Sequence, residues 1–196
     1  MSEVEIWFDV VCPYAYLAST QIEVIARRTG AVVRWEPMLL GGVFLAIGQV
    51  RDPNVAMSEP KRAHTARDLD RWSSHFGVPL KKPAGHPRRT VLAMRAICAT
   101  DEDDRVAAIH ALFSANWARG EDVSDASVVR AALDAAGLDG TALVAHAEDG
   151  EIKDDLRART DRAVAKGVFG APTMFVGGEM YWGQDRLDWV ERALGT

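Results

Sequence analysis

Hydrophobic and polar positions follow two different periods along the chain, beginning with an alternation that is typical of strands. Residues 4–11 are rich in β-branched and aromatic side chains, which predicts a buried strand. The run ends at Cys12, and residues 14–28 repeat their apolar positions at helical spacing. Residues 31–37 then alternate again and predict a second strand. The opening is therefore β-α-β, the unit of a parallel sheet.

Helical spacing dominates the middle of the chain. Residues 41–60 show no clear period and are expected to be irregular. Residues 77–87 hold three prolines and two glycines, which predicts a loop. Amphipathic helices are predicted over residues 60–76, 90–99, 103–119, 125–136 and 141–148.

The last part returns to mixed structure. A charged amphipathic helix is predicted over residues 151–166 and a closing helix over 186–194. Between them, short strands over 173–176 and 179–182 flank Gly177-Gly178, a strong hairpin signal.

This order of elements is typical of an α/β, thioredoxin-like fold with an inserted all-helical domain. We expect residues 1–40 and 151–196 to form a discontinuous thioredoxin-like domain. Residues 41–150 are expected to form the inserted helical domain.

Composition narrows the classes of function. The 196 residues carry 23 Lys and Arg against 28 Asp and Glu, a net charge of −5, so no basic excess favours nucleic acid. No stretch approaches the roughly 18 apolar residues of a membrane span. The acidic start lacks the features of a secretory signal, and we expect a cytoplasmic protein. The two cysteines and five histidines lack the spacing of a metal site, so no metal is expected.

Cys12 is the sharpest candidate for chemistry, because it lies where a strand ends and a helix begins. The free N–H groups and partial positive charge of a helix N-terminus lower a thiol pKa and stabilise a sulfur anion held there. Cys-Pro-Tyr-Ala has the form of a Cys-Pro-x-Cys redox site whose second cysteine is replaced by Ala15. The alternative is that Cys12 is a small buried apolar residue, a role we also expect for Cys98.

Pro172 strengthens the functional interpretation of Cys12. It precedes a short strand, where thioredoxin-like folds place a cis proline that faces the active-site helix. That geometry presents the backbone of Ala171 to a thiol-bearing peptide. The alternative is an ordinary loop proline.

At this level of detail the sequence resembles the 2-hydroxychromene-2-carboxylate isomerases and the kappa-class glutathione transferases, a branch of the DsbA-like thioredoxin superfamily. The resemblance runs through nearly the whole chain, and the final blocks are its most specific part. It is carried by residues 8–17 (FDVVCPYAYL), 47–49 (IGQ), Lys61, 68–72 (DLDRW), 77–80 (GVPL), 167–176 (GVFGAPTMFV) and 182–187 (WGQDRL).

The resemblance implies a glutathione site. The family's catalytic serine, which holds the glutathione thiolate, falls on Cys12. Gln49 stands where the family usually has Asn. The implied glutathione-binding residues are Cys12, Gln49, Lys61, Ala171 with Pro172, and, for the γ-glutamyl end, Gln184 and Asp185.

Four further residues are candidates for a substrate pocket. His86 lies in the proline-rich loop and Arg88 directly follows it, where an arginine would clamp an acidic substrate; the alternative is a solvated basic helix start. Tyr14 and Trp182 would wall an aromatic pocket, with core packing as the alternative.

Three functions remain open. The first is a glutathione-dependent isomerase that acts on a small aromatic keto-acid. For such an enzyme the resemblance implies a role in aromatic catabolism and a homodimeric assembly. The second is a monothiol thiol-disulfide oxidoreductase, or a kappa-type transferase, that uses Cys12. The third is a non-catalytic binding protein of thioredoxin type.

Overall fold

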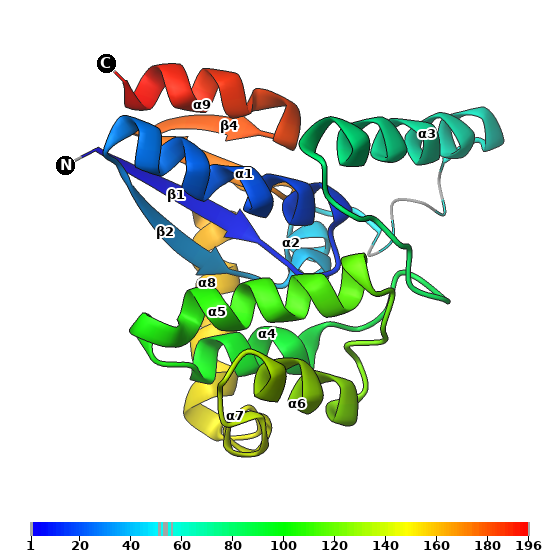
Figure 1. Cartoon of the computed structure of the whole chain (residues 1–196), viewed down its shortest axis with the longest axis vertical. Coiled ribbons are helices and arrows are strands. Elements are labelled where there is room, and N and C mark those ends of the chain that lie inside the picture. The colour runs from blue at the N-terminus through cyan, green and yellow to red at the C-terminus, as the bar shows by residue number, and fades with distance from the viewer. Residues whose placement is uncertain (1, 51, 53–54, 56, 196) are drawn as a thin grey trace.

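A four-stranded mixed sheet of order β2-β1-β3-β4 forms the centre of the protein (Figure 1). The computed structural model describes residues 2–50, 52, 55 and 57–195. Strand β1 (Glu3–Phe8) pairs in parallel with β2 (Val32–Pro37) and antiparallel with β3 (Thr173–Val176). Strand β4 (Glu179–Trp182) pairs antiparallel with β3 through the Gly177-Gly178 turn, as predicted.

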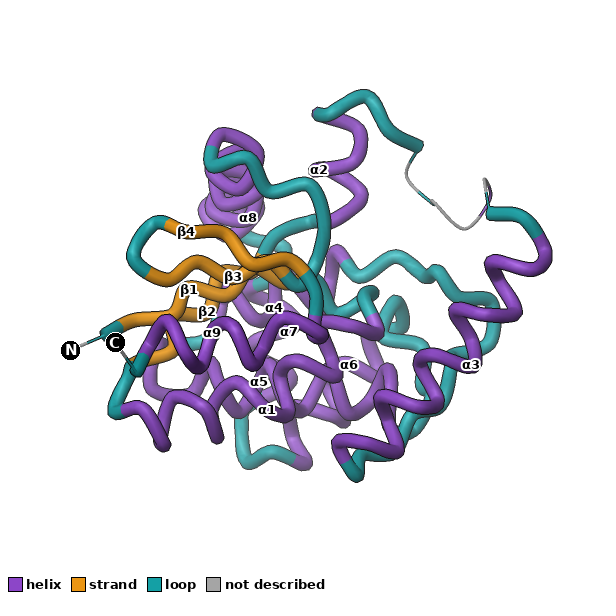
Figure 2. Tube along the Cα trace, turned by 90° about the horizontal axis from the view of Figure 1, so that it is seen from above, coloured by secondary structure: helices purple, strands orange, loops and turns teal. Residues whose placement is uncertain are grey.

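Helices cover both faces of this sheet. Helix α1 (Pro13–Thr29) lies beside α9 (Leu187–Leu194) on one face, and Arg28 pairs with Glu191 across them at 2.8 Å. Helix α8 (Gly150–Ala165) lies on the other face, so that the sheet is seen between the two layers in Figure 2. Strand β1 is buried on both faces, as expected between two helical layers: Val4, Ile6 and Phe8 are fully buried on one face, and Glu5 and Trp7 are also buried on the other.

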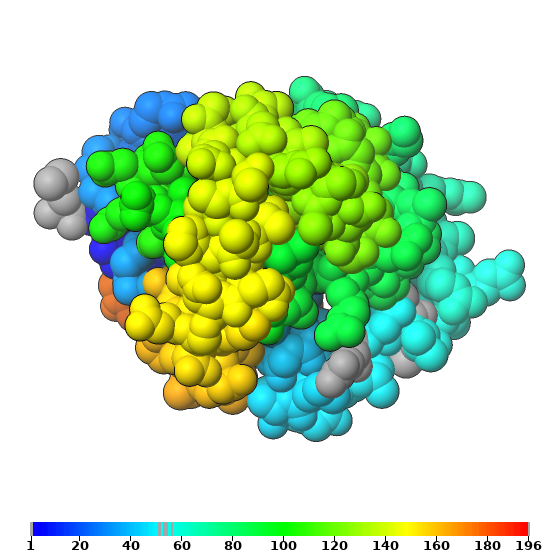
Figure 3. Space-filling view, turned by 90° about the horizontal axis from the view of Figure 1, so that it is seen from below, coloured from blue at the N-terminus to red at the C-terminus, as the bar shows by residue number. Residues whose placement is uncertain are grey.

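Among the described residues, the remaining α-helices and one π-helical turn lie between β2 and α8 in the chain. They are α2 (Leu40–Ala46), α3 (Glu59–Phe76), α4 (Val91–Ala99), α5 (Glu102–Phe113), the π-helical turn η2 (Ser114–Ala118), α6 (Ala126–Ala135) and α7 (Gly140–His146). Helix α8 packs against α2 and α4 as well as β2, and one continuous cluster of buried side chains joins the sheet to these helices. Figure 3 shows α8 and the α6–α7 pair forming one side of the molecule. The division into two domains therefore stays a prediction.

Three predicted boundaries are corrected. Residues 41–60 were expected to be irregular, but α2 forms at their start because tertiary contacts bury Val43 and Phe44. The first strand ends at Phe8 rather than at residue 11, because the chain turns before α1. The helix expected over 103–119 ends at Phe113 as an α-helix and continues as η2. Within the described residues, no helix is both long and apolar enough to span a bilayer.

Candidate functional site

Cys12 lies at the N-terminus of α1, at the C-terminal end of the central strand. It is the N-cap of the helix, with extended backbone (φ −91°, ψ 117°), and Pro13 begins the first turn. The turn before it is closed by the Cys12 N–H, which donates to the Asp9 carbonyl at 3.0 Å. Only 7% of Cys12 is exposed. The strand and the helix together hold its thiol at a fixed and sheltered place.

The thiol of Cys12 meets the segment of Ala171 and Pro172, as predicted. Its Sγ donates to the Ala171 carbonyl oxygen at 3.1 Å. The Ala171–Pro172 bond is cis, and the Gly183 N–H donates to the Pro172 carbonyl at 3.0 Å. Cys12 and Ala171, which are 159 positions apart in the sequence, are thus in direct contact at one site.

The electrostatic surroundings of Cys12 differ from the prediction. Burial raises the pKa of the thiol to about 12, while hydrogen bonds from the backbone N–H groups of Ala15 and Tyr14 lower it, and Asp9 raises it. The expectation of a lowered pKa for this thiol is therefore wrong, because loss of hydration outweighs the effect of the helix N-terminus. At neutral pH Cys12 is a protonated S–H, which acts as a weak hydrogen-bond donor.

Tyr14 connects the thiol to two other elements. It is half-buried, and burial raises its pKa to about 12, with Asp68 of α3, Cys12 and Asp185 acting in the same direction. Asp185 belongs to the short 3-10 helix η3 (Gln184–Arg186), which is in contact with α1. The predicted residues Cys12, Tyr14 and Asp185 therefore share one electrostatic environment.

The turn that carries Gln184 and Asp185 requires a glycine. Gly183 has φ +104°, and a Cβ there would collide with the Asp185 carboxylate. Gln184 is buried, whereas Asp185 is exposed and pairs with Arg186 at 3.2 Å. An exposed pair of this kind contributes little to stability, so the Asp185 carboxylate is available to another cation.

Other predicted pocket residues are not joined to Cys12 by a described contact. The His86 ring packs on Trp117 at 4.9 Å, and its pKa is lowered to about 4 by burial and by Lys82. Arg88 pairs with Asp122 at 3.4 Å in an exposed position. Trp182 is 52% exposed and its ring stacks beside Phe169 at 5.1 Å.

Gln49 and Lys61 flank a segment that is only partly described. Gln49 follows α2 and donates its N–H to the Phe44 carbonyl at 2.7 Å. Lys61 is exposed in the first turn of α3, whose N-terminal end projects away from the sheet (Figure 1). In the described part of the chain, no hydrogen bond or ion pair links either side chain to Cys12, and their role stays a prediction.

Four residues that hold the active-site loop were missed by sequence reasoning. Thr90 donates to the buried Asp9 carboxylate at 2.7 Å. On the other side of the loop, Asn116 and Trp117 of η2 donate to the Val10 carbonyl at 3.2 and 2.7 Å. The only local signal was a polar residue, Asp9, at the end of an apolar strand.

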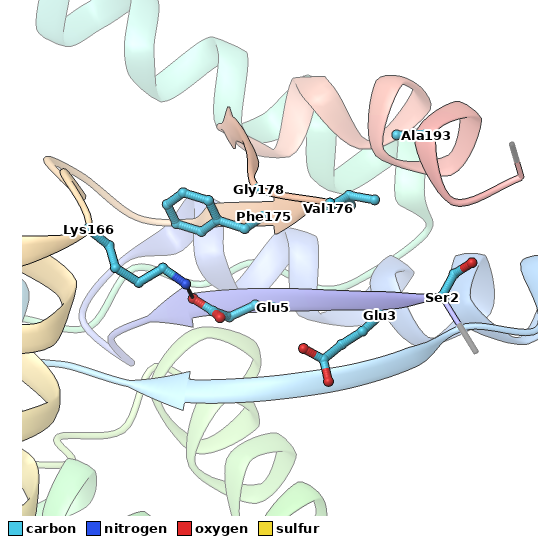
Figure 4. A pocket seen from close by; sticks show the side chains of 9 residues that line it. Ser2, Glu3, Glu5, Lys166, Phe175, Val176, Gly178 and Ala193 are labelled. Carbon is cyan, nitrogen blue, oxygen red and sulfur yellow. Dashed lines mark hydrogen bonds and ion pairs between the residues drawn. The ribbon is translucent and has the colours of Figure 1, made fainter.

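Two cavities lie away from this site. One, of about 680 Å³, opens at the other end of the sheet, where Glu5 and Lys166 face each other at 2.5 Å beside Phe175 (Figure 4). The second, of about 250 Å³, lies between α2, α4 and α8. Neither is lined by a predicted site residue.

Comparison with known proteins agrees with this fold. Residues 3–195 match the family described as DSBA-like thioredoxin domain. The chain therefore belongs to the DsbA-like thioredoxin family, and the predicted fold class is confirmed.

Within this family the relatives are the predicted ones. The 2-hydroxychromene-2-carboxylate isomerase of Sphingobium xenophagum is 32% identical over 191 residues, covering 97% of each chain. Glutathione S-transferase kappa 1 of Rattus norvegicus is 28% identical, covering 97% of this chain and 90% of the relative. A solved 2-hydroxychromene-2-carboxylate isomerase is 30% identical with a TM-score of 0.87, covering 98% of this chain and 94% of that one. The relatives are enzymes, which confirms the prediction that this chain is an enzyme.

Proposed function

We propose that the protein is a glutathione-dependent isomerase of the 2-hydroxychromene-2-carboxylate isomerase type. The observation that carries the proposal is the neutral thiol of Cys12 at the N-terminus of α1, buried beside the Tyr14 and Ala15 N–H groups. Such a group stabilises a sulfur anion brought by a ligand, as the hydroxyl of a serine would.

The donors and acceptors around Cys12 fit glutathione. The S–H and the helix N-terminus suit a thiolate, and the Ala171 carbonyl suits a main-chain N–H of the tripeptide. In the structure the S–H donates to this carbonyl oxygen at 3.1 Å. Binding would turn the S–H toward the thiolate and release the carbonyl to the peptide N–H, so that neither group is left without a partner.

The γ-glutamyl end would lie at η3. The Asp185 carboxylate is suited to its ammonium group, and the N–H groups at the start of the last helical segment are suited to its carboxylate. Lys61 and Gln49 would close the site from α3 and from the segment after α2.

The reaction needs little from the chain beyond placement. Bound glutathione supplies a thiolate that adds to the conjugated double bond of an aromatic keto-acid and later leaves, and between these steps the bond is single and can rotate. The chain lowers the free energy of the thiolate, fixes its direction of attack and excludes water. Tyr14, His86, Arg88 and Trp182 are the proposed contacts to the substrate. Arg88 would bind its carboxylate, and the aromatic residues would bind its rings.

A second candidate is a redox role for Cys12, which is favoured by the presence of a thiol where a serine would suffice. The raised pKa weighs against it, because the thiolate is the nucleophile in disulfide exchange. The chain has two cysteines, and the other, Cys98, lies buried on α4 beside Asp155 and Arg159. Cys12→Ser separates the two functions, since the isomerase tolerates a hydroxyl and disulfide exchange does not.

The first test is calorimetric titration of the fully reduced protein with reduced glutathione, with an isomerase assay on 2-hydroxychromene-2-carboxylate. Asp185→Ala should weaken binding at least tenfold, while Asp188→Ala, which removes an exposed carboxylate three residues further on, should leave it unchanged. Absence of saturable binding at millimolar glutathione would refute the cofactor assignment. Binding without isomerase activity would refute the substrate class and leave the transferase.

A further inference from the structure

Asp9 is a buried carboxylate that follows the central strand and lies three residues before Cys12. It is 2% exposed, and burial raises its pKa. Its Oδ1 accepts from the Val11 N–H at 3.0 Å and from the Thr90 hydroxyl at 2.7 Å. Its Oδ2 accepts from the Leu40 N–H at 2.9 Å. Both oxygens are occupied by neutral donors.

The three donors come from three different helix starts. Val11 lies in the loop directly before Cys12, the N-cap position of α1; Leu40 is the first residue of α2; and Thr90 stands at the N-cap position of α4. The Leu39 and Thr90 side chains cap neither α2 nor α4. Asp9 therefore supplies a cap to α2 from 31 residues away, and it joins the loop of Cys12 to α4.

We infer that Asp9 is the positioning residue of the thiol site, and that this one carboxylate holds the Cys12 loop and the starts of α2 and α4 in a single arrangement. It acts through the loop and does not touch the sulfur's ligand. The inference does not rest on the proposed function, because it concerns the state and place of Cys12 whatever thiol is bound.

Hydrogen bonds to Val10, on the other side of the loop, explain why a change at Asp9 is expected to move Cys12. Asn116 and Trp117 fix the Val10 carbonyl, and the Val10 N–H approaches the Met94 sulfur at 3.4 Å. Val10 is thus held by α4 and η2, and the Asp9 carboxylate before it fixes Val11 after it. Losing one oxygen of Asp9 would let the loop shift as a unit, and Cys12 would move against Ala171.

The test uses Asp9→Asn, which keeps one acceptor oxygen but presents an NH₂ group to one of the present donors. The rate of alkylation is measured against pH for each cysteine separately, by mass spectrometry of peptides. Cys98 is the internal control, because it is equally buried at 7% exposure on α4 and lies outside the loop. The titratable groups that act on the thiol are Asp9 and, on α1, Tyr14, and Asp68 of α3 and Asp185 of η3 act in turn on Tyr14.

In Asp9→Asn we expect alkylation of Cys12 at pH 8 to rise at least tenfold, its apparent pKa to fall, and Cys98 to stay unchanged. Removal of the negative charge and loosening of the loop act in the same direction. Equal rates for Cys12 in both proteins, or a parallel rise at Cys12 and Cys98, would overturn the inference.

Variants of Thr90 test the same inference if Asp9→Asn does not fold. Thr90→Val removes one donor to Asp9 and nearly conserves the volume of the side chain. It should raise the rate of alkylation of Cys12 by a smaller factor than Asp9→Asn does. Thr90→Ser restores the donor and should return the rate to that of the wild type. A common rate in the two variants would show that the hydrogen bond does not position Cys12.

Discussion

Replacement of Cys12 by Ala and by Ser measures the hydrogen bond on which the proposed function depends. Cys12→Ala removes the S–H that would face the glutathione thiolate, while the backbone N–H groups of α1 remain. A hydrogen bond to a charged group contributes about 1.5–3 kcal/mol, and a thiol is a weak donor, so the lower end applies. The change should weaken thiolate binding about tenfold, because 1.4 kcal/mol corresponds to a factor of ten. It should raise the pKa of bound glutathione by about one unit.

Cys12→Ser should act in the opposite direction, since a hydroxyl donates more strongly than a thiol. Bound thiolate is followed by its ultraviolet absorbance as the pH is raised. The two protein thiols stay silent over the useful range, because burial raises the pKa of both Cys12 and Cys98 to about 12. If Cys12→Ala bound glutathione with the wild-type affinity and thiol pKa, Cys12 would not be the group that holds the sulfur. Loss of isomerase activity in Cys12→Ser, with binding intact, would also refute this role.

Two further predictions concern the walls of the site. Gly170→Ala would drive a methyl group into the Trp182 indole nitrogen, so it should lower the free energy of unfolding by about 1–3 kcal/mol, as measured by urea denaturation. An unchanged midpoint would mean that the ring moves aside freely. His86 has a folded-state pKa of about 4 against its usual 6.5, so the unfolded chain binds more protons between these values, and stability should fall as the pH drops from 6.5 to 4. His86→Gln should reduce that fall in thermal midpoint, while His64→Gln, at an exposed position of α3, should not.

Features set by neighbouring residues were predictable from the sequence. The turn at Gly177 and Gly178 has positive φ at both positions, which glycine adopts without strain. The end of α1 is closed by Gly30 in the left-handed region, as helix C-termini often are. Cys12 at the start of α1 was predicted from a strand pattern that ends before Pro13, and the cis bond before Pro172 was predicted from the fold type that the order of elements indicates.

Features set by contacts between distant residues were not predictable in this way. Helix α2 begins where Leu40 donates to a carboxylate 31 positions earlier, and no pattern within residues 41–60 indicates that bond. The bond from Thr90 to Asp9 spans 81 positions. Hydrophobic periodicity reports which side of an element is buried, but not which polar group satisfies a helix end inside the core.

The direction of the pKa shift at Cys12 depends both on neighbouring residues and on contacts with distant ones. The sequence placed the thiol at a helix N-terminus, and the backbone N–H groups of Tyr14 and Ala15 do lower its pKa there. Burial acts more strongly, and burial depends on the packing of Ala171 and of the loop that Asp9 holds. A helix N-terminus stabilises whichever sulfur carries the charge. Since a charge on the buried Cys12 costs its hydration, the charge is better placed on the sulfur of an incoming thiol. In the proposed function Cys12 would then serve as a donor, and the same position would become a redox nucleophile only where the thiol has greater access to water.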